Sequence, residues 1–240
     1  MYKTKNLLTV GADAKTVKGQ DYGFLTGILY LSPAKSSGYQ VCAMARLAQC
    51  EAPCLNTAGR GAMNSVQTSR LNKTLWFFQE KETFMHTLVC NIEALIRKAK
   101  REGLQPRVRL NGTSDIRWER EDFEDVSGRH YMNIMQRFPD VMFYDYTKDA
   151  NRTDLPANYD LTFSYSGVPE FQPYVEKALD KGMRMAVVWR SVAKIPQMFK
   201  GIQVVNGDNS DVRDMDEQGV IVGLYAKGKA KRDTSGFVVG

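Results

Sequence analysis

Residues 24–31 read Phe-Leu-Thr-Gly-Ile-Leu-Tyr-Leu, a short apolar run with turn residues on either side. Such a run is typical of a buried strand. A loop rich in Ser and Gly follows, and the chain then enters Cys42-Ala-Met-Ala-Arg-Leu-Ala-Gln-Cys50-Glu-Ala-Pro-Cys54, which holds three of the four cysteines. An early buried strand that leads into clustered thiols is the feature from which the rest of the chain is interpreted.

Length and composition fit one α/β domain, because a chain of 240 residues is typical of a single (β/α) barrel. Hydrophobic residues make up 43% of the chain, which is enough to bury a core and excludes wholesale disorder. The formal net charge of +6 suits an anionic partner or substrate, and an ordinary soluble surface explains it equally well. No charge-free apolar run reaches the roughly 18 residues of a membrane span, so we expect no membrane partner.

The remaining sequence predicts strands that alternate with helices. One helix starts at Asn64, and a second runs from Lys81 to a stop at Gly103. Short apolar strands follow, each ending in polar residues, over 107–111, 141–144, 161–163, 183–188, 202–205 and 220–224. Together with the early strand they predict an α/β fold with a partial or complete (β/α) barrel. We expect one domain over residues 1–240, with extended N-terminal and C-terminal arms.

The C-terminal arm is basic between residues 227 and 236. It could contact a phosphate backbone or simply be solvated. Residues 1–20 are expected to form an extended arm or an edge strand, and the charged stretch 116–129 is expected on the surface.

The clustered cysteines indicate metal or redox chemistry, because thiols stay reduced in the cytoplasm, where we expect this protein to reside. Three thiolates fill three corners of a [4Fe-4S] cubane and leave one iron for an outside ligand. The C-x7-C-x3-C spacing therefore predicts that Cys42, Cys50 and Cys54 bind such a cluster.

Alternatives to the cluster remain open. Structural zinc prefers four ligands, often in close C-x2-C pairs, and the sequence contains none. Cys90, within the second predicted helix, is either a fourth ligand or a small buried thiol. The three loop cysteines could also be unpaired structural residues.

Polar residues at the strand ends predict a cavity that the open iron faces, because chemistry collects at the carboxyl ends of parallel strands. We assign acid–base or anion-holding roles to Asp115, Asp145 and Lys148. The Gly59-Arg60 loop precedes a predicted helix, and backbone N–H groups at such a site bind carboxylate or phosphate. The residues predicted to bind a cofactor or substrate are Gly59, Arg60, Asn111, Ser114, Ser164, Arg190, Asn206, Asp208 and Lys227.

The chain resembles the phage and prophage gene product 88-like family over nearly its whole length. The resemblance rests on Leu7-Leu-Thr-Val-Gly11, Cys54-Leu-Asn-Thr-Ala-Gly-Arg-Gly61, Arg109-Leu-Asn-Gly-Thr-Ser-Asp115, Phe143-Tyr-Asp-Tyr-Thr-Lys148 and Gly219-Val-Ile-Val-Gly223. It implies a phage or prophage origin, and hence the cytoplasm of a host cell, but no assigned activity. A more distant likeness is to radical S-adenosylmethionine enzymes, which carry three cysteines after the first strand of a partial (β/α) barrel.

Two functions follow from these patterns. In the first, the protein is a cluster-based enzyme whose open iron activates S-adenosylmethionine or a small anionic substrate. In the second, it is a nucleic-acid-binding phage protein whose metal loop, holding zinc or a cluster, is structural. An accessory protein with a redox-sensing cluster is a further option.

Overall fold

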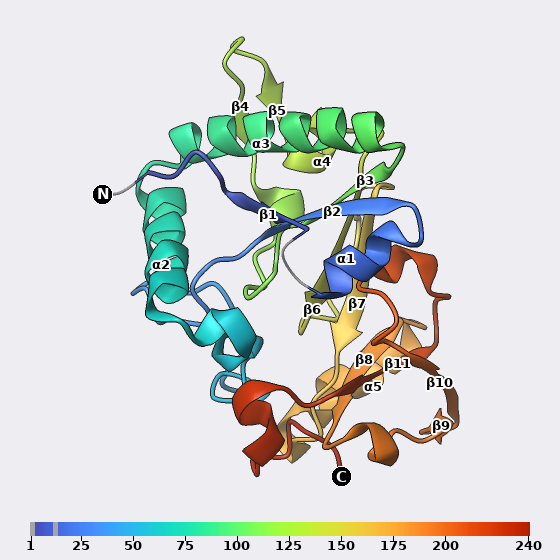
Figure 1. Ribbon diagram of the computed structural model, residues 1–240. Coiled ribbons are helices and arrows are strands. Elements are labelled where there is room, and N and C mark those ends of the chain that lie inside the picture. The colour runs from blue at the N-terminus through green and yellow to red at the C-terminus, as the bar shows by residue number, and fades with distance from the viewer. Residues whose placement is uncertain (1–2, 12–13) are drawn as a thin grey trace.

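The fold is built on a largely parallel nine-stranded sheet, as the computed structural model of residues 3–11 and 14–240 shows (Figure 1). The strand order is β1-β2-β3-β6-β7-β8-β11-β10-β9, and neighbours from β2 to β10 are parallel. The outer pairs, β1 with β2 and β9 with β10, are antiparallel. The strands span Leu8–Val10 (β1), Phe24–Leu29 (β2), Gln105–Arg109 (β3), Met142–Thr147 (β6), Tyr159–Ser164 (β7), Met185–Trp189 (β8), Met198–Phe199 (β9), Ile202–Asn206 (β10) and Ile221–Tyr225 (β11).

Six strands, β2, β3, β6, β7, β8 and β11, pair in the order in which they occur along the chain. All seven strands predicted from the sequence are confirmed, with ends that differ by a few residues. Within the described part of the chain β1 and β9 are free edges, so the sheet is open and a closed barrel is not shown. The α/β class with a dominant parallel sheet is therefore confirmed.

The two long helices are α2 (Asn64–Gln79) and α3 (Lys81–Glu102). Helix α2 packs against α3, and α3 covers one face of the sheet at β1, β2 and β3. Helix α3 buries Phe84, Leu88, Ile92 and Leu95 at helical spacing. These side chains share one core with strand residues such as Val108. The backbone of Gly103 is left-handed, with φ of 69°, and ends α3 as predicted. The remaining helices are short: α1 (Ala14–Gln20), α4 (Ile134–Arg137) and α5 (Gln172–Asp180).

The N-terminal region and the charged stretch differ from expectation in part. The predicted edge strand is confirmed as β1, but the helix α1 after it was not expected, because its sequence carries no apolar period. Residues 1–2 and 12–13 of the expected arm lie outside the described residues. The charged stretch 116–129 is not all surface, since Trp118 within it is fully buried. A small hairpin of β4 (Phe123–Glu124) and β5 (His130–Tyr131) lies in and just beyond this stretch.

The C-terminal arm packs onto the body instead of extending into solvent. Phe237 and Val238 are buried, and Val239 forms a parallel bridge with Trp189 at the end of β8. The Arg190 guanidinium donates hydrogen bonds to the carbonyls of Lys231 (3.1 Å) and Asp233 (2.6 Å). The basic segment is therefore held against the carboxyl ends of the strands.

The other face of the sheet is polar and buried. Successive strand residues point to opposite faces, so Val108 joins the apolar core while Arg107 and Arg109 point the other way. The segment 207–216, which follows β10, lies over this face. Its Asp214 pairs with Arg107 at 2.8 Å, and its Asp211 pairs with Arg109 at 2.9 Å. Ion pairs thus connect a loop at one end of the sheet to a strand near the other.

A substitution at Arg184 would measure how much the ion pairs on this polar face contribute to the stability of the fold. The fully buried side chain of Arg184 forms an ion pair with Asp160 and donates hydrogen bonds to Thr162 Oγ1 (2.9 Å) and the Asp216 carbonyl (2.7 Å). We expect Arg184→Ala to lower the free energy of unfolding by about 3 kcal/mol, because it removes the cation paired with the partly buried Asp160 carboxylate and leaves Thr162 without this partner. Arg97→Ala, at a position with a 69% exposed side chain, should change it by less than about 0.5 kcal/mol. Urea unfolding of both variants measures the difference, and equal effects would contradict this account.

A cysteine-lined cavity as candidate metal centre

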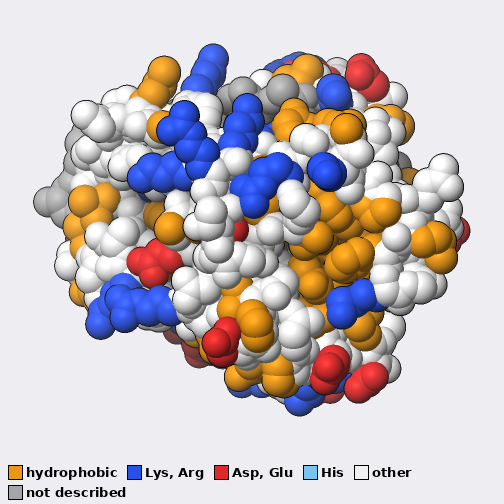
Figure 2. Space-filling view, turned by 90° about the horizontal axis from the view of Figure 1, so that it is seen from below, with side chains coloured by type: hydrophobic (Ala, Val, Ile, Leu, Met, Phe, Trp, Pro, Cys, Tyr) orange, Lys and Arg blue, Asp and Glu red, His pale blue; other side chains and the backbone are white. Residues whose placement is uncertain are grey.

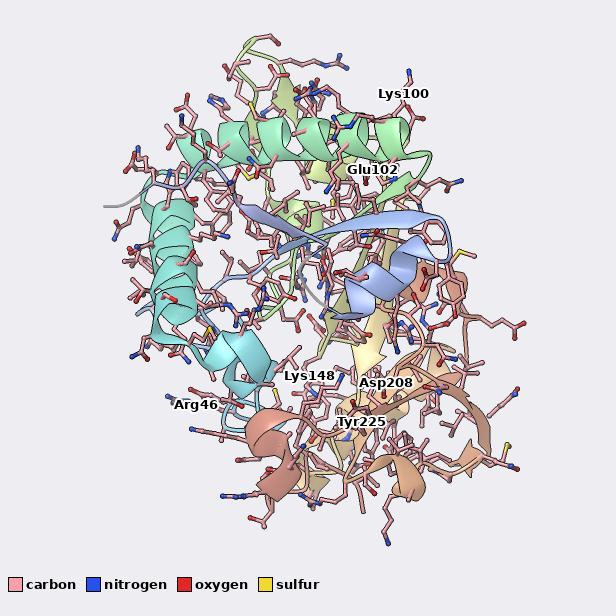
Figure 3. All side chains as sticks on the ribbon, viewed as in Figure 1. Arg46, Lys100, Glu102, Lys148, Asp208 and Tyr225 are labelled. Carbon is pink, nitrogen blue, oxygen red and sulfur yellow. The ribbon has the colours of Figure 1, made fainter. Side chains whose placement is uncertain are left out.

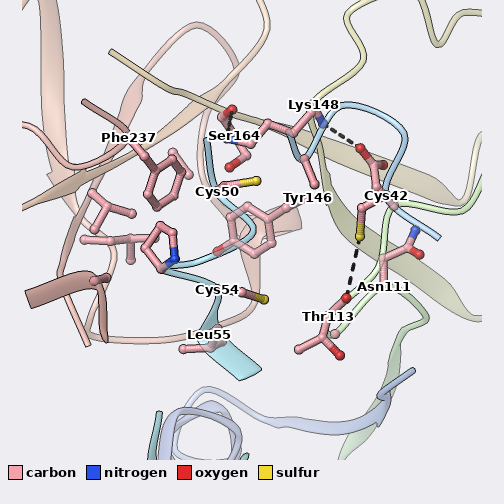
Figure 4. Close-up of a pocket in the computed structure, with 18 of the residues that line it drawn as sticks. Cys42, Cys50, Cys54, Leu55, Asn111, Thr113, Tyr146, Lys148, Ser164 and Phe237 are labelled. Carbon is pink, nitrogen blue, oxygen red and sulfur yellow. Dashed lines mark hydrogen bonds between the residues drawn. The ribbon is translucent and has the colours of Figure 1, made fainter. Parts of the chain in front are cut away.

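The three loop cysteines line one cavity of about 290 Å³ at the carboxyl ends of the central strands (Figure 4). This volume is close to the lower end of the range for small-molecule sites, about 300–1,000 Å³. Arg109, Asn111 and Asp115 reach it from β3 and the loop beyond, and Lys148 and Ser164 from the ends of β6 and β7. Further lining residues include Ser114, Tyr146, Asp208, Asp211, Tyr225, Lys227 and Phe237.

Turns within the loop bring Cys50 back toward Cys42 despite the seven residues between them. The Ala48 N–H donates to the Met44 carbonyl (2.9 Å), and the Cys50 N–H donates to the Ala45 carbonyl (3.0 Å). Gln49 has a left-handed backbone with φ of 52°, a conformation that a non-glycine residue seldom adopts, and it reverses the chain before Cys50. The Ser166 hydroxyl, beyond β7, donates to the Ala48 carbonyl at 2.8 Å and fixes the loop to the sheet.

The thiols of this loop are free and largely buried. Burial raises the pKa of Cys42 to about 12 and also raises the pKa values of Cys50 and Cys54. The neighbouring Asp115 and the other two thiols raise the pKa of Cys42 further, so the three sulfurs are close enough to interact electrostatically. The thiols therefore stay neutral on their own, and a bound cation would be needed to hold them as thiolates.

Two of the three sulfurs each take part in a hydrogen bond with the backbone. The Cys42 thiol donates to the Thr113 carbonyl at 3.7 Å (Figure 4), and the Asn56 N–H donates to the Cys54 sulfur at 3.5 Å. Backbone N–H groups directed at sulfur are among the contacts that tune iron–sulfur clusters.

The described residues show no preformed metal site at the cysteines. In the described residues, no group of three or more His, Cys, Asp or Glu side chains is placed to hold a single metal ion. A tetrahedral zinc with Zn–S bonds of about 2.3 Å requires its sulfurs to lie within about 4 Å of one another. In an iron–sulfur cluster each thiolate binds a different iron, so the sulfurs lie farther apart. The cluster predicted from the sequence stays a prediction.

Lys148 is a buried cation beside the thiols. Its Nζ donates to the carbonyls of Ser164 (2.8 Å) and Tyr165 (3.0 Å) and lies 4.7 Å from the centre of the Phe237 ring. Burial lowers the pKa of Lys148 to about 8, while Cys50 and Asp115 oppose that shift. The ammonium group is thus available to neutralise negative charge at the cysteine wall.

Asp115 is held in place by the chain around it. Its carboxylate accepts the Lys148 backbone N–H at 2.8 Å and pairs with Arg152 at 3.2 Å. Burial raises the pKa of Asp115, and Arg152 opposes this. The carboxylate therefore faces the cavity from a fixed position close to Cys42.

The sequence interpretation missed part of the opposite wall. Arg109 stacks over the Tyr146 ring at 4.7 Å and pairs with Asp211, and none of these three was predicted as a site residue. The predicted residues Lys227 and Asp208 pair with each other at 3.4 Å. Arg109 could have been found from strand alternation, since it lies two residues before Asn111 on the same face. Asp211 carries no such signal, because the path of the segment 207–216 is not readable from its sequence.

Five predicted residues lie outside the cavity lining. Gly59 and Arg60 are exposed on a turn near its mouth, Asn206 is exposed at the end of β10, and Arg190 holds the C-terminal segment. Asp145 is fully buried on the opposite face of β6 from Tyr146, as strand alternation requires. All the other predicted residues line the cavity.

The fold and site together define a mixed α/β protein with a thiol-lined cavity at the carboxyl edge of a parallel sheet. The chain belongs to the gene product 88 family, whose match covers residues 3–240. This confirms the family resemblance seen in the sequence. No curated protein and no solved structure matches the chain, so the likeness to radical S-adenosylmethionine enzymes stays a prediction. Among the described helices none has the length and apolar character to cross a membrane.

The buried carboxyl group of Asp145 should make the stability of the fold depend on pH. The carboxylate accepts the Asn111 N–H (2.7 Å) and the Tyr159 hydroxyl (3.0 Å), yet burial raises its pKa from 3.8 to about 7. The folded protein therefore binds this proton more tightly than the unfolded chain does. The contribution to stability is full below about pH 4 and is lost as the pH rises toward 7.

We expect Asp145→Asn to remove that dependence, because a neutral amide keeps a hydrogen-bond acceptor without ionising. The variant should gain stability relative to the wild type as the pH rises from 4 to 7. Urea unfolding at intervals across this range measures the trend. A stability difference that stays constant with pH would show that Asp145 ionises normally in the folded protein.

Proposed function

We propose that this protein is an iron–sulfur protein in which Cys42, Cys50 and Cys54 bind a [4Fe-4S] cluster with one iron open to the cavity. The observation that carries the proposal is the convergence of three partly buried, free thiols on one wall of one cavity. The backbone N–H group directed at the Cys54 sulfur also supports a cluster, because such contacts tune iron–sulfur centres.

The positions of the remaining Cys and His residues support a cluster whose fourth iron has no protein ligand. Cys90 is exposed on α3, the His86 Nε2–H donates a hydrogen bond to the Glu124 carbonyl at 2.9 Å, and His130 is exposed on β5. None of the three is among the residues that line the cavity. The site that faces the cysteines is instead polar, with cations and carboxylates that suit a small ligand.

The charged and polar residues that line the cavity also support an enzymatic function. When bound, the cluster would supply one-electron chemistry. Lys148 and Arg109 would hold an anionic group of the substrate or of S-adenosylmethionine, and Asp115 would accept a hydrogen bond or a proton. The parallel strands paired in chain order are consistent with a partial (β/α) barrel, in which this edge of the sheet carries the chemistry. Asp145, behind the sheet, would position Asn111 through its backbone N–H.

Single cysteine variants test the proposal. Protein purified without oxygen should contain about four iron and four sulfide per chain, because a cubane has that composition. Cys42→Ala, Cys50→Ala and Cys54→Ala should each lose most of both, since each removes one of three ligands. Iron and sulfide assays together with electron paramagnetic resonance of the reduced protein provide the measurement.

Cys90→Ala is the matched control, because it removes one thiol from an exposed helix position and should leave the iron content unchanged. Colourless wild-type protein, or zinc bound in place of iron and sulfide, would refute the cluster. Equal iron loss in all four variants would point to damage that is not specific to the loop.

A further inference from the structure

Basic side chains gather on the face of the molecule that carries the cysteine loop and the C-terminal segment. Figure 2 views the protein from this end and shows a group of Lys and Arg side chains next to a hydrophobic patch. Two segments supply exposed cations here: Arg60 from the turn Gly59–Ala62, and Lys229, Lys231 and Arg232 from the 3₁₀ helix Gly228–Arg232. We call these four residues the basic rim.

The two segments of the basic rim are joined by specific contacts. The Lys229 N–H donates to the Thr57 hydroxyl at 3.2 Å. Gly228 has φ of +55° and packs so closely that an added Cβ would lie 2.9 Å from the Ala58 Cα. The Arg190 guanidinium donates hydrogen bonds to backbone carbonyls at the end of the same helix. The rim is therefore a fixed arrangement of charge beside the cavity.

The basic rim has no acidic counterpart. None of its four side chains forms an ion pair within the described part of the chain, whereas the adjacent Arg46 and Lys227 pair with Glu51 and Asp208. Clustered cations without partners create a positive potential that attracts a polyanion. One edge of the cavity belongs to the same segment, since Ala230 lines it.

Aromatic side chains line the cavity inside this rim. Tyr146, Tyr225 and Phe237 come from β6, β11 and the C-terminal segment. Cations that follow a phosphate backbone, combined with aromatic rings on which bases stack, are the two features of single-strand binding sites. Enzymes that act on a base likewise take it out of the helical stack into a pocket.

We propose that the basic rim binds the phosphates of a single-stranded nucleic acid and that one of its bases enters the cavity in front of the cysteines. The proposal names the substrate class for the site described above, and it rests on the proposed function for any chemistry at the cluster. Binding itself requires no iron. A membrane surface would meet the same charges, but an aromatic cavity inside the rim favours a base.

Fluorescence anisotropy with a labelled single-stranded DNA tests this. The triple variant Lys229→Gln, Lys231→Gln, Arg232→Gln should bind at least about tenfold more weakly at low salt. The slope of log affinity against log salt should fall by about 2, because each single-strand phosphate contact contributes about 0.7. The matched control is Arg97→Gln, Lys100→Gln, Arg101→Gln, which removes the same charge from α3 at the far end of the molecule (Figure 3). It should bind like the wild type.

Two comparisons test the role of the cavity. A duplex of equal length carries a higher charge density, so binding by charge alone would favour the duplex. A base in the cavity instead predicts tighter binding of the single strand. Tighter binding of the duplex, equal losses in the two triple variants, or binding only to vesicles of anionic lipid would each overturn the proposal.

The same titration with protein that lacks iron separates this inference from the proposed function. If wild-type protein contains no cluster but binds the single strand through the rim, the cluster fails and the nucleic-acid proposal stands. If the cluster is present and no binding occurs at low salt, the nucleic-acid proposal fails and the cluster stands.

Discussion

The ion pair between Arg109 and Asp211 is the constraint on which the cavity depends. Arg109 lies on β3 with a buried guanidinium, and a charge in that position is very costly unless it is paired. The partner comes from the segment 207–216, more than 100 residues later in the chain. Pairing fixes that segment over the sheet and thereby places Asp208 at the cavity. Stability alone does not account for such pairs, because apolar replacements are often at least as stable.

The cysteine wall presents a second electrostatic problem. The cavity lining around the thiols is partly apolar, with Met44, Pro53 and Leu55, and burial keeps the sulfurs protonated. The nearby cation, Lys148, is itself disfavoured by burial. In the proposed cluster, bound metal would hold the sulfurs as thiolates, and their negative charge would in turn favour the Lys148 ammonium group.

The sequence predicted where the strands lie along the chain, because apolar runs and turn residues are local signals. It also placed the cysteines and most strand-end residues at one edge, since the carboxyl ends of parallel strands meet there. Asp145 was predicted to line the cavity but lies outside it, because the face that a residue of β6 occupies depends on how the strand is placed in the sheet. The helix α1 and the ion pairs of segment 207–216 depend on distant partners, such as Val212 beside Gly19, and no local pattern records those contacts.

The C-terminal segment joins the chemistry of the cavity to the charge outside it. Phe237 packs near Lys148, Ala230 lines the cavity, and the exposed cations project from the helix that contains Ala230. Arg190 holds this helix through backbone carbonyls, so its position does not depend on the identity of the basic side chains. The rim charges can therefore act on a partner without supporting the fold. A polyanion on the rim would in turn restrain the wall that faces the cysteines, which couples occupancy of the surface to the shape of the cavity.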